Sequence, residues 1–454
     1  MSTFDRSISP TPAPVREFHF PPVKRSTLAN GLTVIGAAHG QIPLVTFALV
    51  VHAGAEHDTR ATAGLAYLTA RSLEAGTRSR SADRVAWDFE LLGTELDVTV
   101  VFDYAALSVT VPVEKAEAAL ALLAEIATAP AFADDEVERL KREQLAELEQ
   151  RRAEPRALAN DMATQFIYAP DVPYARPVPG TTPSVKHLTT DHVRDFYQAH
   201  WRPAQAALVS VGALDEATVQ ELVVRHFGDW SGGASENVEV DVGTTIERAQ
   251  LFIVDREGAV QSEIRAGHVG LTRSTPDYFA IAVGNGILGG VFTSRLNMSL
   301  REEHGWTYGV RSAFAMRKHE GPFLIQTAVA SDVTSKALQE LLQQTRQLVQ
   351  NGASEEEVVA AREYMAGVMP LEMQTTEELA ARIAEIFVYG LSDDYLPQHR
   401  AALLAVTRDE ANAAARAHIK PDQFAITIVG DAKAIESDLA ALDIGPIEVH
   451  TINE

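Results

Sequence analysis

The sequence predicts an α+β fold built from two similar halves, each a mostly antiparallel β-sheet with helices packed on one face. The first observation is an internal repeat. Residues 132–137 resemble residues 353–358, and residues 207–212 resemble residues 425–430, with nearly the same separation in both pairs. The second observation is the polar, glycine-rich stretch 231–237, which has the composition of a linker. Strand-like and helix-like runs follow in the same order on either side of it, which indicates a duplication.

We therefore expect four parts. They are a flexible N-terminal segment over residues 1–22, a first α+β domain over 23–230, a linker over 231–246 and a second α+β domain over 247–454.

In the first half, Asn30-Gly31 marks a turn before a short strand, and the apolar run 45–52 predicts a buried strand. A helix beginning near Ala63 ends at Gly76, a residue suited to a helix C-cap. Alternating apolar residues over 96–102 and 107–111 predict an antiparallel hairpin. The other predicted elements of this half are helices at 114–128, 134–152, 190–199 and 215–227, a Pro-rich loop over 170–180 and a strand at 207–212.

In the second half, a helix over 276–288 leads to a glycine loop at Gly289-Gly290, a further helix and a strand over 308–312. The other predicted elements are strands at 251–254, 323–328 and 425–430 and helices at 333–351, 354–368 and 376–389.

Composition excludes several classes of protein. The 454 residues exceed what one core usually holds. The net charge of −23 argues against nucleic acid and suits either a basic ligand or simple solubility. The absence of cysteine excludes disulfides, thiol catalysis and thiolate metal sites. With no signal peptide over 1–22 and no apolar run long enough to cross a membrane, we expect a soluble, cytoplasmic protein with no membrane partner; a periplasmic location is not excluded.

One stretch of the second half carries chemistry. Arg301 offers a rigid cation and Tyr308, seven positions later, a phenol hydroxyl. Such a pair can bind a carbonyl oxygen on which negative charge develops. In isolation an arginine and a tyrosine at this spacing are commonly structural. Gly289 and Gly290 suit either a close approach of backbone to a peptide or a tight turn. Phe292 and Trp306 are expected in the core.

The chain resembles the pitrilysin/insulinase family of zinc metallopeptidases, in particular its branch similar to the mitochondrial processing peptidase. The resemblance covers nearly the whole chain and rests on the order and spacing of several short matches. These are Asn30-Gly31-Leu32, Gly64-Leu65-Ala66 through Gly76-Thr77, Gly180-Thr181, Phe196-Tyr197, Arg202-Pro203, and the block from Gly289-Gly290 through Ser294-Arg295-Leu296 and Arg301 to Tyr308.

Active members of that family carry His-x-x-Glu-His after Gly-Leu-Ala, in which the histidines bind Zn²⁺ and the glutamate deprotonates water. Here Tyr67, Ala70 and Arg71 stand at those positions. The family's third ligand falls at about Glu147, with Glu149 as the alternative, and a lone carboxylate is a poor zinc site. The pairs His52/His57 and His187/His192 are spaced wrongly for one helical face. We therefore expect no metal or other cofactor in this chain.

The resemblance implies a function in a two-chain peptidase. In such members one subunit carries the zinc motif, and the other lacks it but keeps the Arg/Tyr pair. We expect this chain to be the second kind, supplying Arg301 and Tyr308 to a peptide or unfolded protein substrate at a partner's zinc, with no activity alone. The alternative is a homodimeric peptide-binding or scaffolding subunit. An active peptidase with a rearranged metal site is the third possibility. Substrate is expected to bind as an added strand on a sheet edge that the sequence does not locate.

Overall fold

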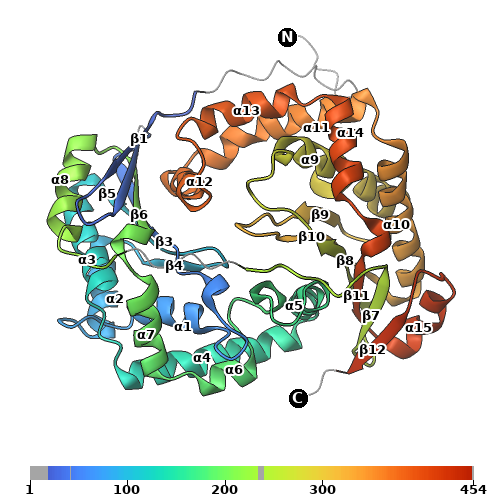
Figure 1. Ribbon diagram of the computed structural model, residues 1–454, viewed down its shortest axis with the longest axis horizontal. Coiled ribbons are helices and arrows are strands. Elements are labelled where there is room, and N and C mark those ends of the chain that lie inside the picture. The colour runs from blue at the N-terminus through green and yellow to red at the C-terminus, as the bar shows by residue number, and fades with distance from the viewer. Residues whose placement is uncertain (1–18, 41, 234–239, 452–454) are drawn as a thin grey trace, which may run out of the picture.

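The computed structural model describes residues 19–40, 42–233 and 240–451, and within these ranges the strands form two six-stranded sheets (Figure 1). The order in the first sheet is β1-β2-β6-β3-β5-β4 and in the second β12-β7-β11-β8-β10-β9. The first-sheet strands are β1 (Val23–Thr27), β2 (Thr33–Ala38), β3 (Leu44–Val51), β4 (Asp97–Val100), β5 (Ala105–Pro112) and β6 (Ala206–Gly212). The second-sheet strands are β7 (Gln250–Asp255), β8 (Gln261–Val269), β9 (Val310–Phe314), β10 (Pro322–Ala330), β11 (Ala425–Gly430) and β12 (Ile447–Thr451).

The two sheets share one topology. In the first, β2 pairs parallel with β6 and the other neighbours are antiparallel. In the second, β7 pairs parallel with β11, and β8, β10 and β9 follow antiparallel, as β3, β5 and β4 do in the first. Only the outermost strand differs, since β12 is parallel to β7 whereas β1 is antiparallel to β2. The predicted α+β class with two similar halves is confirmed.

Helices also repeat in order between the halves. The first half contains α1 (Leu65–Leu73), α2 (Ala82–Leu92), α3 (Ala116–Thr128), α4 (Asp134–Ala153), α5 (Pro155–Ile167), α6 (Thr182–His187), α7 (Thr190–His200) and α8 (Glu216–Phe227). The second contains α9 (Tyr278–Asn285), α10 (Thr334–Asn351), α11 (Glu355–Val368), α12 (Thr376–Val388), α13 (Tyr395–Ala405), α14 (Arg408–His418) and α15 (Ala432–Ala440).

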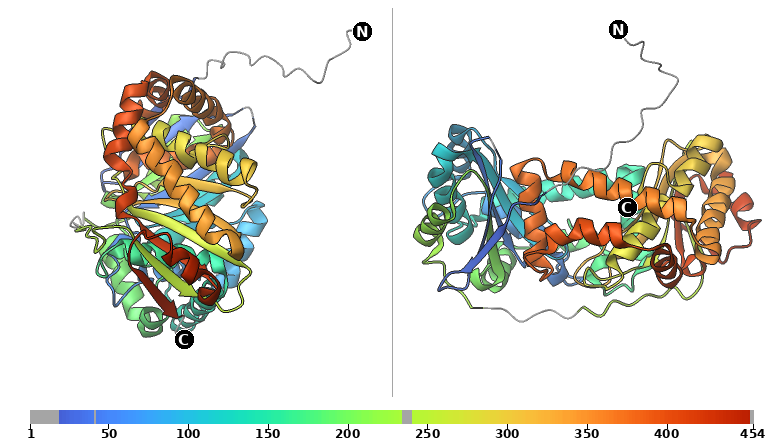
Figure 2. Two further views of the ribbon diagram at one scale, coloured as in Figure 1. Left: turned by 90° about the vertical axis from the view of Figure 1, so that its right-hand side faces the viewer. Right: turned by 90° about the horizontal axis from the view of Figure 1, so that it is seen from above.

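The halves exchange one helix each. Helix α5 of the first half packs on β8 and β11 of the second sheet, and α12 of the second half packs on β3 and β6 of the first sheet. Figure 1 shows both helices beside the sheet of the opposite half, and Figure 2 shows further helices running between the two ends of the molecule. Each sheet is therefore covered on its second face by a helix that the other half supplies.

Local sequence explains why these two helices form. Pro155 occupies the first turn of α5, where no backbone N–H is needed, and the Glu154 side chain accepts a hydrogen bond from Arg156 N at 3.0 Å. Helix α12 begins with a capping box between Thr375 and Glu378. Helix α5 was not among the predicted elements, although Pro155, which lies just past the predicted helix 134–152, is a residue that suits the start of a new helix.

Two hairpin turns meet where the halves adjoin. The turn 101–104 joins β4 to β5, and the turn 315–321 joins β9 to β10. The Arg317 guanidinium lies 3.9 Å from the centre of the Phe102 ring, and Lys318 N donates to Asp103 Oδ2 at 3.3 Å. Nearby, Lys318 Nζ lies 3.2 Å from Glu56 Oε1. These polar contacts hold the halves together alongside the apolar exchange of helices.

The expected domain limits, 23–230 and 247–454, stay a prediction, since α5 and α12 each pack across them. Residues 1–18 of the expected N-terminal segment and residues 234–239 of the expected linker lie outside the described residues. In the part of the chain that is described, no helix is both long and apolar enough to cross a bilayer.

Candidate functional site

The residues aligned with the family's metal motif form a hydrogen-bonded cluster between α1 and α4. Tyr67 on α1 donates from its hydroxyl to Glu147 Oε2 on α4 at 2.9 Å. Burial, and then the Glu147 carboxylate, raises the pKa of the Tyr67 phenol, so the phenol keeps its proton and acts as a donor. Of the two candidate glutamates, Glu147 contacts Tyr67, whereas Glu149 is exposed on the same helix; the assignment of either to a ligand position stays a prediction.

Arg71 completes this cluster. Its guanidinium lies 5.9 Å from the centre of the Tyr67 ring and 3.7 Å from Glu143 Oε2. Ala70 is fully buried in the first-half core and brings no polar atom to the site. A phenol, a guanidinium and one carboxylate do not make a zinc site, because Zn²⁺ prefers imidazole, thiolate and carboxylate ligands. Across residues 19–40, 42–233 and 240–451, no three His, Cys, Asp or Glu side chains are grouped to hold a metal ion.

The two histidine pairs singled out in the sequence have separate surroundings. His57 Nε2 donates to the His52 carbonyl oxygen at 3.2 Å, and the His57 ring stacks 4.1 Å from that of His200. Burial, with the charge of His200 second, lowers the pKa of His57 to about 3, so this ring is uncharged at neutral pH. His187 and His192 both line a cavity on the first half.

Arg301 and Tyr308 lie together on the surface of the second half. Arg301 belongs to a π-helical turn, η6 (Asn297–Glu303), and its guanidinium lies 4.7 Å from the centre of the Phe292 ring and 5.3 Å from that of Tyr308. Tyr308 is 92% exposed and Phe292 is 56% exposed. The expectation of a core Phe292 is wrong, because this ring faces solvent and packs on Arg301. Trp306 is half-buried against the second-half core.

This cluster of Phe292, Arg301 and Tyr308 presents a cation held by two aromatic faces. The only ion pair that Arg301 makes within the described residues is with Glu302, at 3.5 Å between Nε and Oε1. An aromatic ring attracts the face of a guanidinium, whereas the N–H groups point outward in the plane of the guanidinium. These N–H groups therefore remain able to donate hydrogen bonds to another molecule. The cluster is thus able to donate hydrogen bonds outward from both Arg301 and the Tyr308 hydroxyl.

Gly289 and Gly290 end a π-helical turn, η5 (Gly286–Gly290), that continues α9, instead of forming the predicted loop. A Cβ on Gly289 would lie 2.6 Å from Ser312 Oγ and 2.8 Å from Ser312 N. Gly289 therefore lets this turn contact β9 closely, which positions the strand that follows Tyr308. The strand itself begins at Val310 and not at Tyr308.

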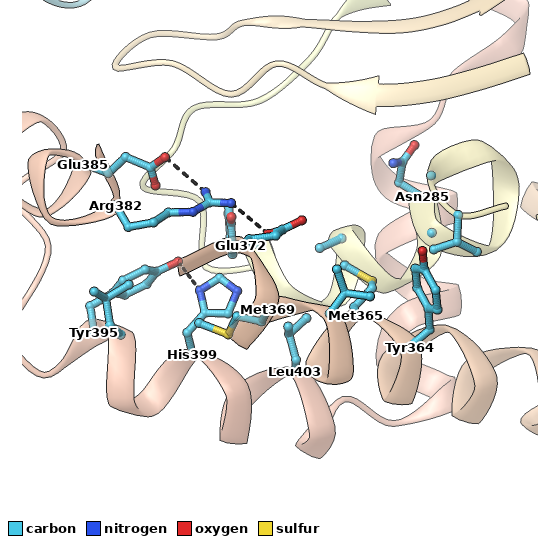
Figure 3. A pocket seen from close by; sticks show the side chains of 17 residues that line it. Asn285, Tyr364, Met365, Met369, Glu372, Arg382, Glu385, Tyr395, His399 and Leu403 are labelled. Carbon is cyan, nitrogen blue, oxygen red and sulfur yellow. Dashed lines mark hydrogen bonds and ion pairs between the residues drawn. The ribbon is translucent and has the colours of Figure 1, made fainter. Parts of the chain in front are cut away.

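Gly290 lines a cavity of about 280 Å³ bounded by α9, α11, α12 and α13 (Figure 3). Arg382 crosses it between Glu372 and Glu385, at 3.0 and 3.2 Å. Tyr395 and His399, both on α13, share a hydrogen bond of 2.9 Å. Burial lowers the pKa of His399 to about 4, with the charges of Arg273 and Arg382 acting in the same direction. No local sequence pattern predicts this cavity, because its walls come from helices far apart along the chain.

Family models match both halves. Residues 34–175 match the insulinase family (peptidase family M16), and residues 187–365 match the peptidase M16 inactive domain. The chain therefore belongs to the insulinase-like M16 family, as its sequence motifs predicted.

Its relatives cover most of its length. An uncharacterized zinc protease of Streptomyces coelicolor is 24% identical over 399 residues, which are 87% of this chain and 86% of that protein. One of Bacillus subtilis is 21% identical over 79% of this chain and 87% of that protein.

Solved structures share the fold. The peptidase M16 inactive domain from Pseudomonas fluorescens has a TM-score of 0.84 at 24% identity, covering 90% of this chain and 98% of that one. A protease from Helicobacter pylori has a TM-score of 0.84 at 17% identity, over 90% and 100%.

Proposed function

We propose that the chain is the non-catalytic subunit of a heterodimeric zinc metalloendopeptidase. In this role it supplies Arg301 and Tyr308 to the substrate carbonyl at a zinc site that belongs to the partner subunit. The observation that carries the proposal is the contrast between two places. At the predicted metal-motif position Tyr67 is hydrogen-bonded to Glu147, whereas Tyr308 is exposed and the half-buried Arg301 has only its neighbour Glu302, at 3.5 Å, as a counter-ion among the described residues.

In the proposed role, this chain stabilises the oxyanion that forms on the substrate. When a peptide carbonyl is attacked, its oxygen gains negative charge. A guanidinium N–H and a phenol O–H at hydrogen-bond distance then lower the barrier, because both bonds strengthen as the charge grows. The Arg301 guanidinium lies 4.7 Å from the centre of the Phe292 ring and 5.3 Å from that of Tyr308, and cation–π attraction to these rings limits the motion that it needs at that moment. The partner would contribute the metal and the base.

Of the four edge strands, two lie next to residues discussed above. β4 is an edge of the first sheet and packs against α1, which carries Tyr67 and Arg71. β9 is the matching edge of the second sheet and begins two residues after Tyr308. A peptide added to an edge strand binds through backbone hydrogen bonds and so tolerates varied side chains. We place the peptide or unfolded-protein substrate along one of these edges. Relatives named zinc proteases are consistent with peptide as the substrate class.

The test is reconstitution. The purified chain is mixed with an M16 subunit that carries His-x-x-Glu-His, and kcat is measured on a fluorogenic peptide. Arg301→Ala or Tyr308→Phe should each lower kcat by roughly 100-fold, the usual loss of one oxyanion donor. Arg84→Ala, an exposed arginine on α2, is the matched control and should keep the full rate.

Two results would contradict the proposal. One is full kcat in both variant complexes. The other is a stable homodimer of this chain that does not associate with the zinc subunit and that binds peptide without hydrolysing it. That result would support the scaffolding alternative.

A further inference from the structure

A second cavity, of about 850 Å³, lies wholly in the first half. Its walls come from the loop before α1, the end of α5 and the segment from Ala175 to His192. Neither the Tyr67–Glu147 cluster nor Arg301 and Tyr308 contribute to it. Its use is therefore independent of the proposed peptidase role.

We propose that this cavity binds a monoanionic carboxylate carried on an apolar body, such as a short fatty acid. The first reason is charge. Arg60, Arg176, His187 and His192 line the cavity, and its described lining contains no aspartate or glutamate. This is unusual for a chain whose net charge is −23. Arg60 is exposed and makes no hydrogen bond or ion pair with a described residue.

Arg176 is the inner cation of the cavity. It is only 9% exposed, and its Nη1 donates to the Pro170 carbonyl oxygen at 2.8 Å. Its Nη2 is buried without a hydrogen-bond partner among the described residues. A buried charge without a paired carboxylate is costly, and an anion in the cavity would offset that cost.

The carboxylates near Arg176 limit how much negative charge the cavity should accept. Asp58 and Asp171 favour the charged form of Arg176, although neither forms an ion pair with it. Both oxygens of Asp58 already accept backbone N–H groups, from Gly64 at 2.8 Å and Ala66 at 3.1 Å. The positive charge of Arg176 is thus partly balanced. This favours a single negative charge over a polyanion such as phosphate.

The histidine rings add one donor. Thr189 N donates to His192 Nδ1 at 3.2 Å, so in the neutral ring Nε2 carries the proton. His187 Nδ1 donates to the Pro183 carbonyl oxygen at 2.7 Å, which leaves its Nε2 as an acceptor in the neutral ring. With one donor, one acceptor and no third ligand residue, this pair suits an anion better than a metal ion.

The rest of the wall is mainly apolar, and its uncharged polar residues are Thr62, Gln165, Thr181 and Ser184. Phe166, Leu188 and Ala175 line it together with three prolines. A simple inorganic anion would leave these surfaces in water, whereas an alkyl chain would cover them.

Calorimetric titration of the purified full chain tests the proposal. Hexanoate, octanoate, hexanol and inorganic phosphate are the four probes. We expect hexanoate to bind saturably at one site. Octanoate should bind roughly tenfold more tightly than hexanoate, because it has two more CH₂ groups to bury. Hexanol and phosphate should each bind at least tenfold more weakly than hexanoate.

Variants locate the site. Arg60→Gln removes an exposed side chain and should weaken hexanoate binding about tenfold, the loss of one charge-assisted contact. Arg408→Gln, on α14 of the other half, removes the same charge and should leave binding unchanged. Arg176→Gln should abolish hexanoate binding. Because Arg176 also donates a hydrogen bond to the Pro170 carbonyl oxygen, circular dichroism checks that this variant is folded. If the Arg176→Gln variant unfolds, the Arg60→Gln variant alone decides the test.

Four outcomes would overturn the proposal. They are no saturable binding, hexanol binding as tightly as hexanoate, phosphate binding more tightly than hexanoate, or unchanged affinity in Arg60→Gln.

Discussion

The Tyr67 hydroxyl donates a hydrogen bond of 2.9 Å to Glu147, the residue that the sequence analysis predicted at the third-ligand position of the family's metal site. In this chain the partner of that carboxylate is a phenol. Arg71, one helical turn after Tyr67, packs against the same ring. The helices that would carry a metal site are therefore still side by side, although their side chains now bind one another.

This arrangement predicts that a zinc site can be restored. The triple substitution Tyr67→His, Ala70→Glu and Arg71→His places two imidazoles on one face of α1, opposite Glu147. We expect it to retain about one zinc ion per chain after dialysis, measured by atomic emission, and the unaltered chain to retain none. Adding Glu147→Gln to the triple variant should lower zinc retention. A folded triple variant without zinc would contradict the placement of Glu147.

Phe292 is predicted to position Arg301. Its ring stacks on the guanidinium at 4.7 Å, so Phe292→Ala should loosen that group and lower kcat of the reconstituted complex about threefold, the size of one exposed cation–π contact. Phe292→Tyr keeps the ring and should restore the rate. KM and thermal stability should change little in either variant. An equal loss in both variants would show that the aromatic face is not the cause.

The exchange of helices predicts coupled stability of the halves. Ile383 on α12 is fully buried against the first sheet. Ile383→Ala should lower the free energy of unfolding by about 2–5 kcal/mol, because a core cavity is left behind. The control is Leu371→Ala, at a side chain that is 59% exposed, and its effect should stay within about 0.5 kcal/mol. Urea denaturation followed by circular dichroism measures both. Similar losses in the two variants would argue that α12 is only loosely docked.

The contact between Glu56 and Lys318 predicts a pH dependence. Burial raises the pKa of Glu56 from 4.5 to about 7, while Lys318 acts in the opposite direction. Between these pH values the folded protein holds a proton that the unfolded chain has released. The stabilisation from this group is therefore complete below pH 4.5 and is lost as the pH rises to 7.

Glu56→Gln removes this titration. As the pH rises from 4.5 to 7.5, the unaltered chain should lose about 3 kcal/mol more of its free energy of unfolding than the variant does. This difference follows from the size of the pKa shift of Glu56. Lys318→Met should push the pKa of Glu56 higher still, so its loss of stability should extend above pH 7. Denaturation curves at a series of pH values provide the measurement, and parallel pH profiles for the variant and the unaltered chain would refute the assignment.

Some features of the fold follow from local sequence alone. The alternating pattern that becomes β5 and the apolar run that becomes β3 are signals contained in a few neighbouring residues. Helix α5 could also have been found, because an acidic residue followed by Pro155 is a helix-start signal. The sheet on which α5 packs could not have been predicted, because no residue pattern within Pro155–Ile167 indicates whether the helix packs on the first sheet or the second.

The sequence by itself determined the duplicated α+β architecture and the family, because both follow from residue types at fixed spacings. Only the tertiary structure decided that Tyr67 binds Glu147, that α5 and α12 cross between halves, and that Phe292 faces solvent on Arg301. These relationships join residues far apart in the chain or depend on which side of an element faces water. Such contacts are fixed by packing over the whole molecule, which no local pattern contains.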